Sequence, residues 1–433
     1  MGLRQTIEGL QRSDRLTTVF KPVSRRLEAA AILNEMGDRP VLFQKIVESD
    51  FRIAGNLFGT KQSIAEYFGV PQARLIPMMV EAIRNPSRPE EVRNAPCQEC
   101  TLEEVDLDRL PILFHCDRDG GNYISSGVFF TRSREGVQNV DFHRAMQIGR
   151  DRFSVRIVRQ RNFDELLNRD QELPVAVCVG NSPNVLLAAA ISVPLGQNEL
   201  EIANSLEPLK VTRARTFPAL IPAEAEFVLE GVVHLKQKAD EGPFVDLTET
   251  YDFVRQEPVF EVRLITHRRD AIWQALLPGK LEHKILMGMP REPTIFKEVN
   301  DAGVECLDVN VNPGGCSWLH ALVKIRKRRE DDGRKAIDAA FRGHKSCKHV
   351  FVVDEDIDIY NPLETEWAMA TRFQADRDLV LKEKEKGSSL DPSADPETSV
   401  TQKVGFDCTK PLVAGKKNFE KAVFPRVDLK SFL

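Results

Sequence analysis

The sequence lacks any apolar run long enough to cross a lipid bilayer, and its first residues lack the apolar core of a secretory signal peptide. It also lacks an excess of one charge, because 60 basic residues are set against 65 acidic ones, for a net charge of −5. No general electrostatic field therefore attracts nucleic acid or an anionic membrane. We expect a soluble, cytoplasmic protein with no nucleic-acid or membrane partner, in which local groups hold any bound anion.

Cysteine is scarce, with 8 in 433 residues, which is typical of reduced thiols rather than of a disulfide framework. Cys97 and Cys100 form the only CxxC pair, and a structural zinc site would need two further ligands. His115 and Cys116 are candidates, but they lie in an apolar, strand-like run. We therefore favour an inert loop over a zinc site.

The patterns that are present predict a globular chain of two or three domains, since 42% of the residues are apolar. Residues 1–105 mix helix-like stretches at 26–36 and 75–84 with a strand-like stretch at 40–46, which indicates an α/β part. A helix is expected over 182–192, with Ser182 as its cap and Pro183 in its first turn. Short strand-like runs dominate the middle of the chain and favour an antiparallel barrel or sandwich: 111–116, 123–133, 153–160, 173–180, 226–235 and 259–268.

Strands and helices alternate again from residue 294, which indicates a second α/β unit. Residues 381–403 contain few apolar side chains, so we expect an extended arm or a mobile segment there.

Polar side chains are densest between residues 137 and 167, where they alternate with apolar ones: Asn139, Asp141, His143, Arg144, Arg156, Arg159 and Arg161. Guanidinium groups on a barrel surface can hold a phosphate by paired, charge-assisted hydrogen bonds. The alternative is a solvated strand edge, and periodicity alone favours that alternative.

Glu199 follows an amide side chain at the start of a helix-like run, 194–206. An asparagine oxygen and a glutamate carboxylate are hard ligands that suit magnesium or manganese shared with a phosphate. The alternative is an ordinary first-turn acid favoured by the helix dipole, and the residues alone favour it.

Glu241 and Asp246 stand at the two ends of the stretch EGPFVD. Two carboxylates held close together cannot both ionise freely, so one of them can serve as a general acid near neutral pH. An arginine between them would oppose that shift, and the group would titrate as a coupled set. The alternative is a turn with two solvated acids.

Nine sequence blocks, in order along the chain, resemble the UbiD family of reversible decarboxylases, which includes 3-polyprenyl-4-hydroxybenzoate decarboxylase and ferulic acid decarboxylase. The blocks are DGGNYISSG (119–127), NVDFHRAM (139–146), PLGQNELEIA (194–203), EFVLEG (226–231), EGPFVD (241–246), PGKLEHKILMGMPRE (278–292), NPGGCSWLHALVKI (312–325), GSSLDPSA (387–394) and KVGFDCTKP (403–411).

The resemblance implies an α/β (α+β) fold in which a central antiparallel split β-barrel, residues 106–293, carries the cofactor and the catalytic residues. It implies an N-terminal α/β part, residues 1–105, and a C-terminal α/β oligomerisation domain with an extended tail, residues 294–433. Relatives of this kind form homo-oligomers, as dimers or hexamers.

The resemblance also implies prenylated FMN, made by a separate flavin prenyltransferase, with its phosphate bound through Mn2+ and with K+ nearby. By motif, Asn139 and Glu199 are the metal ligands, while Arg144, Glu241 and Asp246 are catalytic and Asp246 protonates the carbon that loses CO2. Some relatives have a histidine as a third metal ligand where this chain has Asn162. The positions that contact the cofactor are Phe142, His143, Arg144, Arg156, Ile157, Val158, Arg161 and Asn162.

The compact chain resembles the archaeal-type members that convert trans-anhydromevalonate 5-phosphate to isopentenyl phosphate. Arg159 and Arg161 would suit this phosphorylated carboxylic acid, although they would also suit the cofactor. One alternative is an aromatic hydroxy acid, such as a 4-hydroxybenzoate derivative. Another is a non-catalytic flavin-binding or assembly protein, which would have no reason to keep Arg144, Glu241 and Asp246 together.

Overall fold

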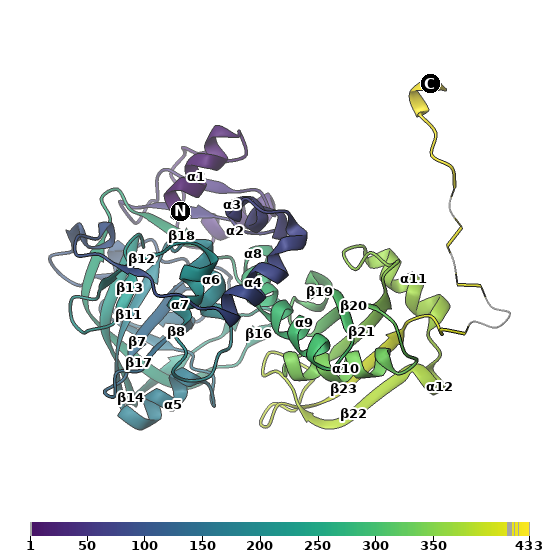
Figure 1. Cartoon of the computed structure of the whole chain (residues 1–433). Coiled ribbons are helices and arrows are strands. Elements are labelled where there is room, and N and C mark those ends of the chain that lie inside the picture. The colour runs from purple at the N-terminus through teal and green to yellow at the C-terminus, as the bar shows by residue number, and fades with distance from the viewer. Residues whose placement is uncertain (1, 414–417, 420, 423, 433) are drawn as a thin grey trace.

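The structure is a computed structural model that describes residues 2–413, 418–419, 421–422 and 424–432. Figure 1 shows two lobes: the N-terminal part and a large curved sheet form one, and the C-terminal domain forms the other. Helix α4 (Leu75–Arg84) packs on α9 (Glu292–Asp301) where the lobes meet. No helix among the described residues has both the length and the apolar content needed to cross a membrane.

The central sheet is antiparallel throughout, which confirms the predicted antiparallel split β-barrel. The long strand β14 bends at two bulges, between Glu230 and Gly231 and between His234 and Lys238, which curve the sheet. A side chain at Gly231 would lie 1.9 Å from the carbonyl oxygen of Glu261, so only glycine permits this close approach. In sheet order the strands are β6 (Tyr123–Ile124), β9 (Ala145–Gln147), β10 (Arg152–Val155), β17 (Arg255–His267), β14 (Phe227–Glu241), β11 (Glu172–Val179), β7 (Val128–Arg132) and β8 (Gln138–Phe142), with β5 (Cys100–Thr101) beside β17.

The predicted strand at 111–116 is wrong, because this segment makes only isolated bridges, Leu113 with Tyr123 and Phe114 with Arg26. Its apolar side chains are buried as a loop over the sheet, so apolar content alone misled the prediction.

The N-terminal part contains a four-stranded sheet of β1 (Thr17–Val19), β2 (Val41–Phe43), β3 (Arg52–Gly55) and β18 (Ile272–Ala275). Strand β18 returns from far along the chain and ties this part to the barrel. The two predicted helices are confirmed. The helices here are α1 (Leu3–Arg12), α2 (Glu28–Met36), α3 (Lys61–Phe68) and α4, and a small sheet joins β13 (Leu220–Pro222), β12 (Lys210–Arg213) and β4 (Glu90–Glu91).

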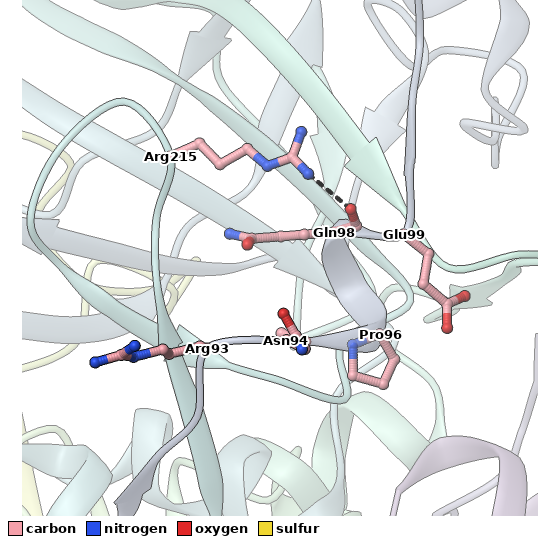
Figure 2. Close-up of a pocket in the computed structure, with 7 residues that line it drawn as sticks. Arg93, Asn94, Pro96, Gln98, Glu99 and Arg215 are labelled. Atoms are coloured by element: carbon pink, nitrogen blue, oxygen red, sulfur yellow. Dashed lines mark hydrogen bonds between the residues drawn. The ribbon is translucent and has the colours of Figure 1, made fainter.

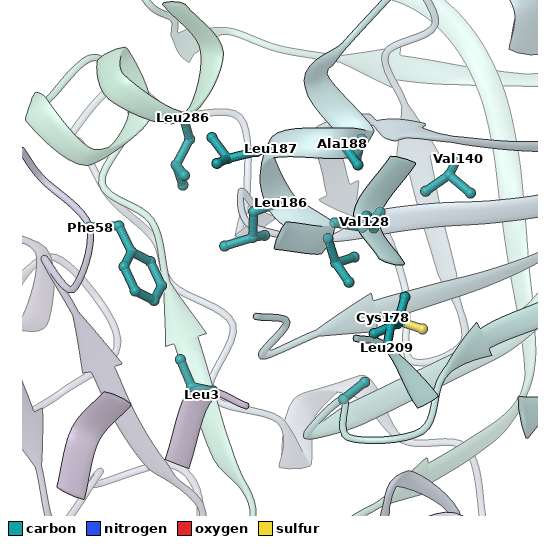
Figure 3. Close-up of a cluster of buried hydrophobic side chains, with 14 of the residues drawn as sticks. Leu3, Phe58, Val128, Val140, Cys178, Leu186, Leu187, Ala188, Leu209 and Leu286 are labelled. Carbon is teal, nitrogen blue, oxygen red and sulfur yellow. The ribbon is translucent and has the colours of Figure 1, made fainter. Parts of the chain in front are cut away.

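Helix α6 (Pro183–Ala190) is buried along its whole length and links the N-terminal part to the barrel in one core. Figure 3 shows Leu186 and Leu187 of this helix between Phe58 and Val128, which belong to the two parts. Ser182 is the N-cap residue and Pro183 lies in the first turn, as predicted, but the Ser182 hydroxyl donates to Asn184 Oδ1 at 2.5 Å instead of accepting a backbone N–H. Three further helices are α5 (Asn162–Asp170), α7 (Glu199–Leu206) and α8 (Leu281–Gly288).

The C-terminal domain has a five-stranded sheet in the order β19 (Glu305–Asn310), β20 (His320–Arg326), β21 (His349–Asp354), β23 (Val400–Cys408) and β22 (Leu379–Lys386). Its helices are α9, α10 (Asp332–Gly343), α11 (Pro362–Arg372) and α12 (Ala375–Asp378).

The prediction of an extended arm or a mobile segment at 381–403 is wrong, because most of β22 and the start of β23 lie in this segment and pair with each other in the C-terminal sheet. The loop between them is anchored by Asp391, which is buried and forms an ion pair with Lys348 at 2.8 Å. An edge strand is held by backbone hydrogen bonds and needs few apolar side chains, so composition was a poor guide.

Candidate active site

Arg144 lies between β8 and β9, and its guanidinium group is bound by Glu241 at the end of β14. Nε donates to Oε1 and Nη2 donates to Oε2, both at 2.9 Å. Glu241 is fully buried. This two-point, charge-assisted contact fixes the plane of the guanidinium group.

The acids at the two ends of EGPFVD reach the same arginine because the chain turns back on itself after β14. Strand β15 (Phe244–Val245) pairs with β16 (Tyr251–Asp252) in a short hairpin. Arg144 Nη1 contacts Asp246 Oδ2, and Nη2 donates to Asp252 Oδ2 at 2.9 Å. The structure thus brings Arg144, Glu241 and Asp246 together.

Asp252 is a member of this cluster that sequence reasoning missed. It also forms an ion pair with Arg255 at 2.6 Å. Asp252 lies opposite Phe244 on the second strand of the hairpin. A hairpin predicted from the turn-rich stretch LTET would have found Asp252, since its partner strand ends beside Asp246.

The cluster holds three carboxylates and two guanidinium groups, so one acid has no cation of its own. Burial acts to lower the pKa of Arg144, but Asp246 and Glu241 outweigh it and hold this pKa above its ordinary value. Burial acts to raise the pKa of Asp252, and Arg144 and Arg255 together keep it below its ordinary value.

Tyr123 holds Glu241 in place and was also missed from the sequence. Its hydroxyl donates to Glu241 Oε1 at 3.0 Å and accepts the backbone N–H of Gly242 at 2.9 Å. Its ring stacks on Phe244 with the ring centroids 3.9 Å apart, and the Arg144 guanidinium lies 5.3 Å from the Phe244 centroid. Burial raises the pKa of Tyr123, so its hydroxyl stays a donor.

His283 of α8 is a further titratable group near this cluster. Its Nδ1 accepts the backbone N–H of Gly279 at 3.0 Å, which leaves Nε2 to carry the proton of the neutral ring. Burial lowers the pKa of His283, while Asp246 acts in the opposite direction and Arg144 acts in the same direction as burial.

Asn139 on β8 and Glu199 at the start of α7 are both buried. Glu199 Oε2 accepts the backbone N–H of Val140 at 3.1 Å, and no ion pair to Glu199 exists among the described residues. Burial raises the pKa of Glu199 to about 8, and Asp141 acts in the same direction. A buried carboxylate without a cation is a site that a bound divalent ion would stabilise.

The part of the chain that the structure describes contains no group of three or more His, Cys, Asp or Glu side chains placed to hold a metal. A cation at Asn139 and Glu199 would therefore rest on few protein ligands. The Asn162 amide N–H donates to the carbonyl oxygen of Val193 at 3.1 Å, so only the Asn162 amide oxygen could act as a ligand of the cation. Asp141 Oδ1 and His143 Nε2 lie 3.0 Å apart on the same side of β8.

The other predicted cofactor positions follow β8 and β10. Phe142 is half-buried, and the His143 ring packs against Phe163 with centroids 4.5 Å apart. Arg156 forms an ion pair with Glu257 at 2.8 Å. Ile157 is buried, whereas Val158 and Arg161 are exposed just before α5.

The cysteine and histidine residues considered for zinc form no metal-binding group among the described residues. Cys97 is buried in the barrel core. The ring of His115 instead packs edge-on against Phe244 with centroids 5.8 Å apart. The backbone N–H groups of His115 and Cys116 donate to Asp119, and burial raises the pKa of Asp119 to about 6.

A surface hollow of about 330 Å³ lies on residues 93–99, in the segment that follows α4, and on Arg215 (Figure 2). Arg215 donates to the carbonyl oxygen of Gln98 at its wall. The hollow shares no lining residue with the Arg144 cluster: it is lined by Arg93, Asn94, Ala95, Pro96, Gln98, Glu99 and Arg215.

Comparison with known proteins assigns the class. Three family models match in succession, described as the 3-octaprenyl-4-hydroxybenzoate carboxy-lyase N-terminal domain at 7–83, its Rift-related domain at 90–281 and its C-terminal domain at 284–408. The chain belongs to the UbiD family of carboxy-lyases, which confirms the resemblance seen in the sequence.

Within this family, the anhydromevalonate phosphate decarboxylase of Methanothermobacter thermautotrophicus is 40% identical over 91% of this chain and 94% of its own. That of Methanosarcina mazei is 38% identical over 98% of this chain and 100% of its own. Among solved structures, the UbiD-class enzyme HmfF from Pelotomaculum thermopropionicum, in complex with FMN, aligns with a TM-score of 0.95 at 33% identity, over 100% of both chains. The 3,4-dihydroxybenzoic acid decarboxylase of Klebsiella pneumoniae aligns with a TM-score of 0.91 at 26% identity, over 100% of this chain and 98% of that one.

Proposed function

We propose that this protein is a prenylated-FMN-dependent decarboxylase that converts trans-anhydromevalonate 5-phosphate to isopentenyl phosphate and CO2. The observation that carries the proposal is the Arg144 guanidinium held by Glu241, Asp246 and Asp252. The relatives named anhydromevalonate phosphate decarboxylase support the choice of substrate, because they match almost the whole chain.

The residues around Glu199 fit a flavin phosphate held through a cation. Burial raises the pKa of the Glu199 carboxyl group, and the buried Asn139 amide nitrogen has no hydrogen-bond partner among the described residues. That N–H group could donate to a phosphate oxygen, while the Asn139 amide oxygen and the Glu199 carboxylate would be the oxygen donors to the cation. Mn2+ would suit this set of oxygen donors, with the Asn162 amide oxygen as a further ligand and K+ nearby. When bound, prenylated FMN supplies an acceptor for the electron pair that CO2 leaves behind, which no side chain does well.

The protein groups would orient the substrate and time the proton transfer. Arg144 would bind the substrate carboxylate, because its guanidinium plane is fixed by Glu241 and Tyr123. The bond between the carboxylate carbon and C2 breaks, and a C–H bond forms at C2. Asp246, whose side chain is 17% exposed against 0% for Glu241, would deliver that proton.

The assembly expected for this chain is also part of the proposal. We infer three domains divided near residues 105 and 293, a homo-oligomer formed as a dimer or hexamer, and a cytoplasmic location. The cofactor would come from a separate flavin prenyltransferase. Light scattering of purified protein tests the oligomer, and the absorbance spectrum after expression with and without the prenyltransferase tests the source of the cofactor.

The experiment that tests the function uses protein expressed beside a flavin prenyltransferase and reconstituted with Mn2+. We expect CO2 and isopentenyl phosphate in equal amounts, with one deuterium at the terminal alkene carbon when the reaction runs in D2O. Turnover of a 4-hydroxybenzoate derivative alone would overturn the substrate assignment. Bound flavin without turnover of either acid would favour a non-catalytic flavin-binding protein.

A further inference from the structure

Arg291 ends the 3-10 turn Met289–Arg291 that follows α8, and no acidic partner of it is found among the described residues. Nη1 donates to Ser192 Oγ at 2.6 Å and Nη2 to the carbonyl oxygen of Ala190 at 2.5 Å. The guanidinium group lies 5.1 Å from the centroid of the Trp318 ring. Its Nε is buried and has no hydrogen-bond partner. Among the described residues, no carboxylate forms an ion pair with it.

Two other enclosed arginines of the described chain, Arg372 and Arg144, are paired with acids, in contrast to Arg291. Arg372 is buried and binds Asp354 at 2.9 Å and Asp356 at 2.7 Å. Arg144 has three acids. Burial, with a smaller contribution from the charge of Arg161, lowers the pKa of Arg291 to about 9. Burying a guanidinium group without a counter-ion costs free energy, and a bound anion would offset part of that free energy.

The surroundings of Arg291 are positive on several sides. His344, whose Nε2 lies 2.8 Å from the carbonyl oxygen of Trp318, is kept neutral by burial, which lowers its pKa to about 3. The charges of Arg291, Lys403 and Arg161 all act on His344 in the same direction as burial. Arg161 comes from the barrel, Arg291 from the segment after α8, and Lys403 from the C-terminal sheet.

Arg159 does not belong to this group, although the sequence placed it beside Arg161. Its charge acts on Lys238 of β14, together with Asp164 and Glu257. The side chain of Arg161, in contrast, makes no hydrogen bond or ion pair with the described residues, and its charge acts on Arg291 and on His344. The structure therefore separates two arginines that the sequence could not tell apart.

The spacing of His283 and Arg291 along α8 and the turn after it suits a substrate with charges at both ends. His283, near Asp246, and Arg291 are separated by eight residues of helix and turn, or about 12 Å at 1.5 Å per residue. An extended chain of six bonds between a carboxylate carbon and a phosphorus atom spans about 7 Å. The side chains of Arg144 and Arg291, each several ångströms long, can span the distance that remains between the substrate and the backbone.

We propose that Arg291 and Arg161 form a subsite for the phosphate group of the substrate, with Trp318 of the C-terminal domain as its wall. The subsite rests on the proposed function, because it requires a substrate that carries a phosphate monoester. The flavin also carries a phosphate, but the groups that fit a phosphate-bound cation, Asn139 and Glu199, belong to β8 and α7 instead. Arg161 directly precedes Asn162, a candidate ligand of that cation, so the flavin phosphate is the alternative ligand of this subsite.

The test measures binding and turnover in cofactor-loaded protein with the variants Arg291→Met and Arg161→Gln. The probes are isopentenyl phosphate and the matching alcohol without phosphate, followed by calorimetry. Arg159→Gln is the matched control, since it removes a neighbouring exposed arginine outside the subsite. We expect the Kd of isopentenyl phosphate to rise at least 30-fold in Arg291→Met, about tenfold in Arg161→Gln and not at all in the control. Affinity for the alcohol should stay constant in all of them.

Kinetics should show the same pattern, with a raised KM for the phosphorylated acid and a nearly unchanged kcat, because the phosphate is bound equally in the ground and transition states. Arg291→Lys should restore part of the affinity. Wild-type affinity in both variants, with turnover of the phosphorylated acid intact, would overturn the subsite and leave the proposed function standing. Loss of flavin from the variants at unchanged affinity would assign the arginines to the cofactor phosphate and also overturn it. A wild-type protein that neither binds isopentenyl phosphate nor decarboxylates its parent acid would remove the proposed function itself.

Discussion

Replacing Glu241 by glutamine is the most direct test of the Arg144 cluster, because it removes one charge and almost no volume. The buried carboxylate accepts two hydrogen bonds from Arg144 and one from Tyr123. Glutamine has a single acceptor oxygen, and its amide nitrogen must face either the guanidinium group or the Tyr123 hydroxyl, which can turn to accept. At least one N–H of Arg144 then loses its partner.

The structure allows a rough magnitude. A hydrogen bond to a charged group contributes about 1.5–3 kcal/mol, and a buried ion pair broken on one side costs about 3–5 kcal/mol. Arg144 keeps Asp246 and Asp252, so we expect the free energy of unfolding to fall by about 2–3 kcal/mol. If the same loss of orientation acts in the transition state, kcat falls about 100-fold, since each 1.36 kcal/mol is a factor of ten.

The assay pairs urea unfolding, followed by tryptophan fluorescence, with CO2 release by cofactor-loaded protein. Glu66→Gln is the control, because Glu66 forms an exposed ion pair with Arg15 at 2.6 Å that contributes less than about 1 kcal/mol. The control should keep wild-type activity. A Glu241→Gln protein with wild-type kcat would refute the reasoning, since a guanidinium group without its main anchor would then still orient the substrate.

The other predictions use the same measurements. Asp246→Asn should retain flavin and lower kcat at least 100-fold, because the proton donor is lost while the metal ligands are untouched; retained deuterium incorporation from D2O at the wild-type rate would contradict this role. Tyr123→Phe should lower stability by about 1–2 kcal/mol and kcat less than Glu241→Gln does, because the carboxylate loses one of three donors. Glu199→Gln should lower manganese and flavin content together, as seen by metal analysis and absorbance, and unchanged content would remove Glu199 from the metal site. Burial raises the pKa of Asp119 to about 6 from 3.8, so its contribution to stability is complete below about pH 4 and is lost as the pH rises through 6. Asp119→Asn should abolish that loss in urea unfolding between pH 4 and 7.

Much of the candidate site could be predicted because its members stand in short, ordered motifs. Asn139 and Arg144 share one motif, and Glu241 and Asp246 share another. Asp252 escaped prediction because it depends on the register of a two-stranded hairpin rather than on a motif.

Arg291 was unremarkable in the sequence for a different reason. It lies in a recognised motif, but a missing partner is a property of the space around a side chain and not of its neighbours in the chain. Ser182 shows the same limit, since the residue type predicted a cap and a nearby buried amide took the hydroxyl instead.

The sequence by itself determined the local features: helices α2, α4 and α6, the antiparallel strands of the barrel and the acids at the two ends of the turn after β14. Periodicity and turn chemistry act over a few residues, so they can be read directly. Only the tertiary structure decided that Arg144 meets acids 97, 102 and 108 residues further along the chain, and that the polar segment 381–403 completes a sheet. Those contacts come from the pairing of distant strands, whose energy lies in burial and backbone hydrogen bonds that no local pattern records.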